Sequence, residues 1–347
     1  MLFNKDIGID LGTANTLIYI KGKGIVINQP SVIAVDTGVR KILAVGKAAK
    51  DMIGKAPEHI KVIRPLQDGV ISDFEMTASM LRVFLKGILD GAGFLTRIRI
   101  VVGVPSGVTE VEKRAVEEVI RQMGARDVYI LDEPMAAAIG CGLPVDDPMG
   151  CMVADIGGGT SDIAIIALGG IVTSTSLRHA GDKLNEAIVT YMRKSYDLLI
   201  GDQTAEELKI GIGCAYFEEG AEDLDDGHLL YLDAKGRDII TGLPKTIKIS
   251  SKEIHEALEE PIGVIIDGIR NTLEHTPPEL AADIVSHGMV LTGGGGLIRG
   301  LDKLITKNTG LQVYIAENAL EAVAEGTGKS LKNIDKLERY ASKKLRR

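Results

Sequence analysis

Cysteine is scarce in this chain of 347 residues, which contains only Cys141, Cys151 and Cys214. The number is odd and no two of them have the spacing of metal ligands, which argues against both a disulfide framework and a cysteine-bound metal. The six histidines do not cluster and no His-Glu-x-x-His motif is present, so we do not expect a zinc enzyme. Reduced, mostly buried thiols of a cytosolic protein fit this pattern best.

Basic residues do not outnumber acidic residues. The net charge is −8 and the isoelectric point is about 5.4, so the overall positive charge typical of nucleic-acid binding is missing, and we expect no nucleic-acid partner. Only the stretch 329–347 is locally basic. It reads either as a solvated helix face and tail or as a contact for an acidic partner or lipid.

Long hydrophobic runs are missing as well. Runs such as 98–104 are too short to cross a bilayer, and residues 1–6 lack the apolar core of a signal peptide. We therefore expect no transmembrane segment, although the protein could still lie on a membrane surface.

Several familiar catalytic motifs are absent too. The chain has no Gly-x-x-x-x-Gly-Lys-Ser/Thr loop, no Gly-x-Gly-x-x-Gly in a dinucleotide-binding context, and no Gly-x-Ser-x-Gly elbow at a strand–helix turn. These absences exclude the P-loop nucleotide hydrolases and give no support for a dinucleotide-binding enzyme or an α/β-hydrolase.

A repeated hairpin is present instead. The segments Ile7–Ile20 and Met152–Ile166 both read as an apolar strand, an Asp-x-Gly turn and a second apolar strand. Their turns carry the Gly, Thr, Asn and Asp residues that tight hairpins need. With 45% hydrophobic and 25% charged residues, the composition is that of a globular protein, and the length predicts two domains. The repeated hairpin predicts that the two domains share one design and that each begins with a hairpin.

The rest of the first half alternates strands and helices, which predicts an α/β fold. We expect strands at Ile98–Val104 and Val128–Leu131, and a short helix at Met135–Gly140. Between the two strands, Thr109-x-x-Glu112 forms a capping box that opens a helix. This helix should end at Gly124 and bury one face, made of Val111, Ala115, Val119, Ile120 and Met123.

Two stretches do not fit the repeated core. Residues 24–65 are rich in β-type and turn residues, and residues 216–249 are acidic and hairpin-rich, so both read as small insertions. After the second, Ser250-x-x-Glu253 caps a long helix to about residue 274, and Pro277-Pro278 reads as a stop signal. A strand from Val290 then enters a glycine turn before a helix at about 298–306.

Three glycine-rich turns each follow an apolar strand. The backbone amides of such turns can converge on phosphate oxygens without obstruction by side chains. One copy alone is usually structural, but two matched Asp-x-Gly hairpins and the third turn, Gly293–Gly296, together indicate a phosphate-binding site.

Three carboxylates stand at informative positions. Asp10 and Asp155 occupy equivalent places in the two hairpins, where they either cap the turns or share a Mg²⁺ ion through water. Glu133 follows a strand and opens a helix, where it either complements the helix N-terminus or orients an attacking water.

Four motifs together resemble the actin, Hsp70 and sugar-kinase superfamily, and most closely the MreB/Mbl family of bacterial actin homologues. They are Asp10-Leu-Gly-Thr-Ala-Asn-Thr16, Leu131–Gly140, Asp155-Ile-Gly-Gly-Gly-Thr-Ser-Asp162 and Leu291–Gly296. The similarity extends from Asp6 to about Lys329.

The resemblance implies an actin-like, ribonuclease-H-like fold of two related domains, with a nucleotide in the cleft between them. Domain I would comprise residues 1–142 and 320–347 with an insertion at about 24–65, and domain II residues 143–319 with an insertion at about 182–249. The implied ATP-binding residues are Gly12, Thr13, Ala14, Asn15, Gly157, Gly158, Gly159, Thr160, Glu206, Glu207, Lys209, Gly293, Gly294, Gly295 and Gly296. Asp10 and Asp155 would meet Mg²⁺, and Glu133 with Thr160 and Asp155 would serve hydrolysis.

The family also implies a function. Its members are slow ATPases that polymerise into paired filaments on the inner face of the bacterial cell membrane, where they guide wall synthesis and maintain rod shape. The implied partners are further copies of the chain, the membrane, the adaptor RodZ, MreC and the wall-synthesis machinery. Phe94 and Leu95 resemble the membrane-inserting loop of the family, although by themselves they could equally pack into the core.

Three alternatives within the superfamily remain. One is a plasmid-segregating or division-associated actin relative, which shares the fold but diverges in these loops. An Hsp70-like chaperone would need a substrate-binding domain after the nucleotide domain, and a small-metabolite kinase would need a polar sugar site in the cleft. We see neither feature in the sequence.

Overall fold

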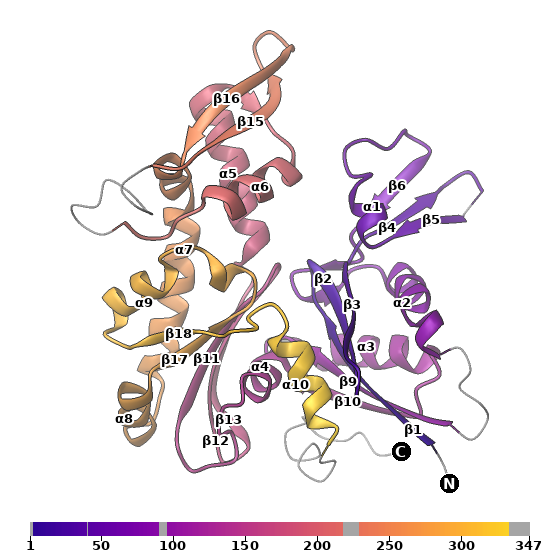
Figure 1. Ribbon diagram of the computed structural model, residues 1–347, viewed down its shortest axis with the longest axis vertical. Helices are drawn as coiled ribbons and strands as arrows, with labels where there is room; N and C mark the ends of the chain where they lie inside the picture. Colours follow the sequence, from indigo (N-terminus) through magenta and orange to yellow (C-terminus); the bar gives the residue numbers. More distant parts are fainter. Residues whose placement is uncertain (1–2, 40, 90–95, 218–228, 333–347) are drawn as a thin grey trace.

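The computed structural model describes residues 3–39, 41–89, 96–217 and 229–332. In these ranges the chain forms two lobes, each built around a five-stranded sheet, and each lobe carries a smaller sheet at its outer end (Figure 1). This arrangement agrees with the predicted α/β fold of two related domains, each with a small inserted unit. The boundaries assigned to the two domains stay predictions.

The main sheet of the first lobe has the order β10-β9-β1-β2-β3. Its strands are β1 (Phe3–Leu11), β2 (Asn15–Ile20), β3 (Gly24–Pro30), β9 (Thr96–Val104) and β10 (Asp127–Asp132). β1 and β2 form the predicted antiparallel hairpin, and β1 also pairs in parallel with β9. Because β3 pairs with β2, residues 24–30 belong to this main sheet and not to the insertion that the sequence assigned to residues 24–65.

The main sheet of the second lobe repeats this plan with the order β13-β12-β11-β17-β18. Its strands are β11 (Cys151–Ile156), β12 (Ser161–Ala167), β13 (Gly170–Leu177), β17 (Met289–Thr292) and β18 (Val313–Ile315). The predicted hairpin is β11–β12, and β11 pairs in parallel with β17 just as β1 pairs with β9. Both hairpins therefore lie at the centre of their sheets, with their turns at equivalent edges.

Helices cover the sheets. In the first lobe these are α2 (Phe74–Leu89) and α3 (Glu110–Gln122); in the second, α5 (Gly181–Tyr196), α7 (Ser251–Glu274), α8 (Pro278–His287) and α9 (Leu301–Thr309). Between the two sheets lie α4 (Glu133–Gly140) and α10 (Ala322–Ser330), whose side chains share one apolar cluster with both sheets (Figure 1). α4 and α10 thus join the lobes at their base.

The crossing of α4 and α10 depends on two glycines. A Cβ atom at Gly140 would overlap the backbone oxygen of Ala322, and one at Gly326 would overlap the backbone oxygen of Ala136. The helices approach backbone to backbone, which only residues without side chains allow. This close contact fixes the position of Glu133, the first residue of α4.

The small units complete each lobe. The first contains β4 (Ile33–Asp36), β5 (Lys41–Val45), α1 (Lys47–Lys50) and β6 (Ile60–Ile63), followed by the short hairpin β7 (Leu66–Gln67) and β8 (Val70–Ile71). The second contains β14 (Leu198–Leu199), α6 (Asp202–Ile212), β15 (Tyr231–Asp238) and β16 (Pro244–Ser250). A 3₁₀ turn, η1 (Gly295–Leu297), follows β17. The predicted hairpin in 216–249 is therefore present, and residues 218–228 of that segment lie outside the described residues.

Both predicted capping boxes are formed. The hydroxyl of Thr109 accepts a hydrogen bond from the Glu112 amide, and Ser250 and Glu253 repeat the arrangement at α7. The predicted buried face of α3 is wrong at its first member, because Val111 is 76% exposed and the buried positions include Val116 instead. Val111 lies in the first turn of α3, whereas the buried Val116, Val119 and Ile120 lie in its later turns.

Candidate functional site

A cavity of about 440 Å³ opens between the two lobes. Most of the residues that the sequence singled out lie around it: Asp10, Gly12, Thr13, Ala14, Asn15, Glu133, Asp155, Gly157, Gly158, Gly159, Thr160, Glu206, Lys209, Gly293, Gly294 and Gly295. They come from both hairpin turns, from the start of α4, from α6 and from the turn after β17. The fold thus gathers segments from the whole chain around one space.

The two hairpin turns approach each other closely, and both line the cavity. A Cβ atom at Gly158 would lie 2.6 Å from the Cβ of Ala14, and one at Gly159 would lie 2.5 Å from Oγ1 of Thr13. Side chains at these positions would push the two loops apart, so glycine is needed for their close approach. The loops consequently present backbone amides, and few side chains, to the cavity that both of them line.

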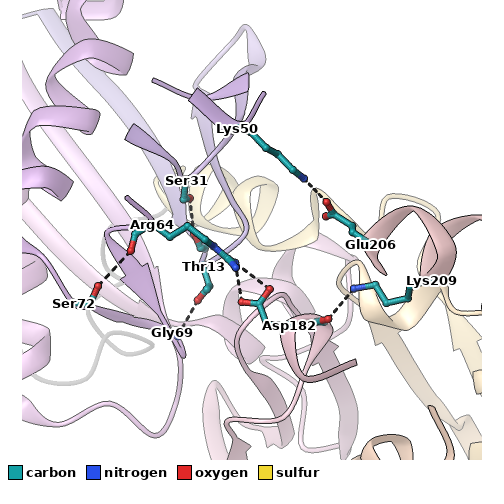
Figure 2. Close-up of polar contacts among 11 residues, drawn as sticks. Thr13, Ser31, Lys50, Arg64, Gly69, Ser72, Asp182, Glu206 and Lys209 are labelled. Atoms are coloured by element: carbon teal, nitrogen blue, oxygen red, sulfur yellow. Dashed lines mark hydrogen bonds and ion pairs between the residues drawn. The ribbon is translucent and has the colours of Figure 1, made fainter. Parts of the chain in front are cut away.

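Hydrogen bonds hold the first loop in place. The Gly69 amide, in the turn between β7 and β8, donates to Oγ1 of Thr13 at 2.9 Å, and Oγ of Ser31 donates to the Gly12 carbonyl at 2.6 Å (Figure 2). The loop is therefore shaped before any ligand binds, which lowers the entropic cost of binding.

Three carboxylates line the cavity: Glu133 and Asp155 are buried, and Asp10 is half-buried. Burial, and secondarily the charge of Asp155, raise the pKa of Asp10 to about 8. Burial also raises the pKa of Asp155 to about 7, against the opposing effect of a 2.8 Å hydrogen bond from the Thr292 hydroxyl. Burial and the nearby charge of Asp162 raise the pKa of Glu133 well above its usual value. Such a concentration of acidic groups is costly in the absence of a compensating positive charge.

A divalent cation fits this donor set. Mg²⁺ prefers oxygen ligands, keeps several waters and is commonly held by one or two carboxylates together with phosphate oxygens. Among the described residues no group of three or more His, Cys, Asp or Glu side chains is arranged to hold a metal by itself. Asp10 and Asp155 therefore suit an ion that shares its coordination with water and phosphate.

The α6 side of the cavity is polar. Glu206 and Lys209 line it, and Nζ of Lys209 donates to the Gly181 carbonyl at 2.8 Å (Figure 2). Burial lowers the pKa of Lys209, although the charges of Glu206 and Asp182 act in the opposite direction.

Two sequence-predicted residues of this region do not line the cavity. Glu207 is exposed on α6, where it accepts a hydrogen bond from Gln203 at 3.2 Å. Gly296 lies within η1, where a Cβ would meet the side chain of Leu291. Glu206 lines the cavity, whereas Glu207, the next residue of α6, points to solvent.

The structure adds residues that carried no sequence motif. Ile210, Leu297 and Leu320 line the cavity and are 72%, 47% and 53% exposed, respectively, which gives one end of it an apolar rim. Such a rim can cover the flat face of a purine. Asp182, Asn185 and Arg299 add polar side chains to the cavity wall, and Gly69 adds its backbone.

The predicted membrane-contacting residues Phe94 and Leu95 lie outside the described residues, and their role stays a prediction. Within the described parts of the chain, no helix combines the length and hydrophobicity that a membrane-spanning segment requires.

Two lobes of common plan, joined at their base by α4 and α10 and separated by a cavity with a glycine loop from each lobe, define an actin-like protein. Comparison with solved structures agrees. The chain superimposes on crystal structures of MreB5 of Spiroplasma citri bound to ADP and to AMPPNP with TM-scores of 0.89 and 0.87, at 40% identity, over 96% of this chain and 98% and 97% of those chains. A MamK double helical filament shares the fold, with a TM-score of 0.78 at 20% identity over 95% of this chain and 99% of that chain.

Sequence comparison identifies the family. The family described as MreB/Mbl protein matches residues 4–339. The chain is 47% identical to the cell shape-determining protein Mbl of Bacillus cereus over 98% of this chain and 99% of that protein. It is also 47% identical to the cell shape-determining protein MreB of Escherichia coli over 96% and 95% of the two chains. This chain belongs to the MreB/Mbl family, as its motifs predicted.

Proposed function

We propose that the chain binds ATP with Mg²⁺ in the cavity between the lobes and hydrolyses it slowly. One observation carries this proposal: the two Asp-x-Gly loops and the Gly293–Gly295 turn, far apart in the sequence, line the same cavity. The Spiroplasma citri relatives bound to ADP and AMPPNP support a nucleotide as the ligand.

The lining residues suit the parts of that ligand. We assign the phosphates to the backbone amides of the loops 12–15 and 157–160, which lie close to each other and both line the cavity. Glu206 and Lys209 would contact the ribose, and the Gly293–Gly295 turn with the apolar rim would enclose adenine. Mg²⁺, held by Asp10 and Asp155 through water, would neutralise phosphate charge.

Hydrolysis requires a positioned water. Glu133 opens α4 and lines the cavity, and Thr160 ends the second phosphate loop, so the two side chains are the candidates to orient this water. The raised pKa of Glu133 means that its carboxylate, once ionised, accepts a proton readily. We expect slow turnover, because the nucleotide would act as a switch for polymerisation.

We further propose that the nucleotide-bound chain polymerises with other copies of itself into paired filaments on the inner face of the cytoplasmic membrane. There it would organise cell-wall synthesis and maintain rod shape, with RodZ and MreC among its partners. The support is family membership with cell shape-determining proteins. Phe94 and Leu95 are the predicted membrane contacts, and two apolar side chains anchor weakly, so many copies along a filament would have to act together.

The test compares ATP consumption, sedimentation and liposome binding in one preparation. ATP-Mg²⁺ should cause the chain to sediment and to bind anionic liposomes, while a panel of sugars should leave ATP consumption unchanged. A chain that binds ATP but stays monomeric, or whose ATP consumption rises with one sugar, would contradict the filament proposal and favour a small-metabolite kinase or an Hsp70-like role.

A further inference from the structure

A row of alternating charges joins the two lobes (Figure 2). Three of its members, Asp182, Glu206 and Lys209, line the cavity, and we call this edge of the cavity its mouth. Arg64, just after β6 of the first lobe, donates from Nη2 to both carboxylate oxygens of Asp182, at 3.0 and 2.7 Å. Asp182 lies in the first turn of α5 in the second lobe. One guanidinium therefore binds the two lobes together at this point.

A second pair lies beside the first. Nζ of Lys50, at the end of α1 in the first lobe, contacts Oε2 of Glu206 on α6 at 2.5 Å. Lys209 completes the row, since it lies one turn after Glu206 and donates to the carbonyl of Gly181, the neighbour of Asp182. The row thus runs Lys50, Glu206, Lys209, Asp182, Arg64, with a cation at each outer end (Figure 2).

The two acidic members have a second role. Asp182 and Glu206 both line the cavity, whereas Lys50 and Arg64 are not among its lining residues. The cations therefore act on the site through the carboxylates that they hold. Each pair joins the small unit of the first lobe to a helix of the second, so the mouth cannot widen at this point without breaking a charge-assisted hydrogen bond.

We propose that Lys50 and Arg64 are positioning residues of the nucleotide site. From the facing lobe they hold Glu206 and Asp182 in place and keep the mouth closed, and a bound nucleoside di- or triphosphate leaves when these pairs separate. This inference rests on the proposed nucleotide binding and adds to it the step that limits exchange.

The size of the effect follows from exposure. The side chains of Arg64 and Asp182 are 35% and 28% exposed, and those of Lys50 and Glu206 are 36% and 30% exposed. Pairs at such partly solvated positions are weakened by solvent and salt. Nη2 of Arg64 meets both oxygens of Asp182, whereas Nζ of Lys50 meets one oxygen of Glu206, so we expect the Arg64 pair to be the stronger. We expect the dissociation rate of bound nucleotide to rise about three- to tenfold in Arg64→Ala, about two- to fivefold in Lys50→Ala, and roughly as the product in the double variant.

The experiment measures release of a fluorescent ADP analogue from the full-length chain after mixing with excess ATP, at low and high salt. Lys61→Ala in β6 and Lys47→Ala in α1 are the matched controls, because both side chains are exposed and no ion pair of theirs occurs among the described residues. Thermal unfolding of every variant verifies that it is folded. Arg64→Lys, which keeps the charge but not the planar guanidinium, should release nucleotide more slowly than Arg64→Ala.

Asp182→Asn supplies the coupling test. If the Arg64 contact acts through Asp182, then Arg64→Ala should add little to the release rate in the Asp182→Asn background. Rapid release in the variants, slow release in the controls and a faster wild-type rate at high salt would support the proposal. Release rates within twofold of wild type in both Lys50→Ala and Arg64→Ala would overturn it while leaving nucleotide binding intact. If the wild-type chain binds no nucleotide at all, the proposed function fails first, and this inference fails with it.

Discussion

Replacing Asp10 by asparagine should make the empty protein more stable at pH 8, although the residue belongs to the proposed site. In the folded chain the pKa of Asp10 is raised from 3.8 to about 8, first by burial and then by the charge of Asp155. Between these values the folded state holds a proton that the unfolded state has released. The free energy of unfolding of the wild type therefore falls as the pH rises through this range, and the penalty is complete above about pH 8.

The magnitude follows from the size of the rise. Roughly four pKa units at about 1.4 kcal/mol per unit give an upper bound of about 6 kcal/mol. Asp10 faces the open cavity, where water screens its charge, so we expect about 1–3 kcal/mol. Asparagine has nearly the same shape and no charge, so Asp10→Asn removes this penalty at high pH and changes little near pH 4.

Urea-induced unfolding without nucleotide or divalent cation, at pH 5, 6.5 and 8, measures the effect. The advantage of Asp10→Asn should grow with pH, while Asp267→Asn, exposed on α7, should show no such gain. The wild type should recover its lost stability at pH 8 when ATP-Mg²⁺ is added, and the variant should recover less. Equal or lower stability of Asp10→Asn at pH 8 would refute the argument that burial of these carboxylates is costly in the empty cavity.

Three further substitutions test other parts of the account. Glu133→Gln should lower the ATP hydrolysis rate by about 10²-fold or more while nucleotide affinity stays within a few-fold, and unchanged hydrolysis would remove Glu133 from the mechanism. Gly326→Ala, whose new methyl group would overlap the backbone of α4, should reduce the free energy of unfolding by about 2–4 kcal/mol in thermal or urea unfolding, whereas Gly263→Ala, with open space around it, should be neutral or stabilising by up to about 1 kcal/mol. Phe94→Ala combined with Leu95→Ala should abolish liposome binding but not nucleotide binding; unchanged co-sedimentation would show that the membrane contact lies elsewhere.

Local sequence patterns predicted much of the fold. The two Asp-x-Gly hairpins and the capping boxes at Thr109 and Ser250 depend on residues close together in the chain, and all of them are present. The predictions failed where distant packing decides. Val111 matches the apolar period of α3 but is exposed, and β3 belongs to the main sheet because of its pairing with β2.

One helix was missed for a local reason. Pro277 and Pro278 read as a stop signal, yet Pro278 is the first residue of α8. Proline is well suited to this position, because the first turn of a helix has no acceptor for its amide and needs the φ angle that the ring imposes. The same residues therefore end one element and begin the next.

The residues of the site also fall into two groups: those that a local motif reveals and those that only the tertiary structure brings together. The glycine loops could be predicted from the sequence because each is a short motif, and their repetition indicated that they form one phosphate-binding site. The pair of Arg64 and Asp182 was not visible, because the two residues are 118 positions apart and neither belongs to a motif. Glu206 and Glu207 could not be told apart without the orientation of α6, which the tertiary packing sets.

The central claim is that nucleotide in the cleft between the lobes drives assembly of the chain. Electron cryomicroscopy of the purified chain incubated with AMPPNP and Mg²⁺, beside a sample without nucleotide, tests it most directly. We expect paired filaments only in the presence of nucleotide, with density for the phosphates in the cavity beside the loops 12–15 and 157–160. Filaments that form equally well without nucleotide, or nucleotide density outside this cleft, would contradict it.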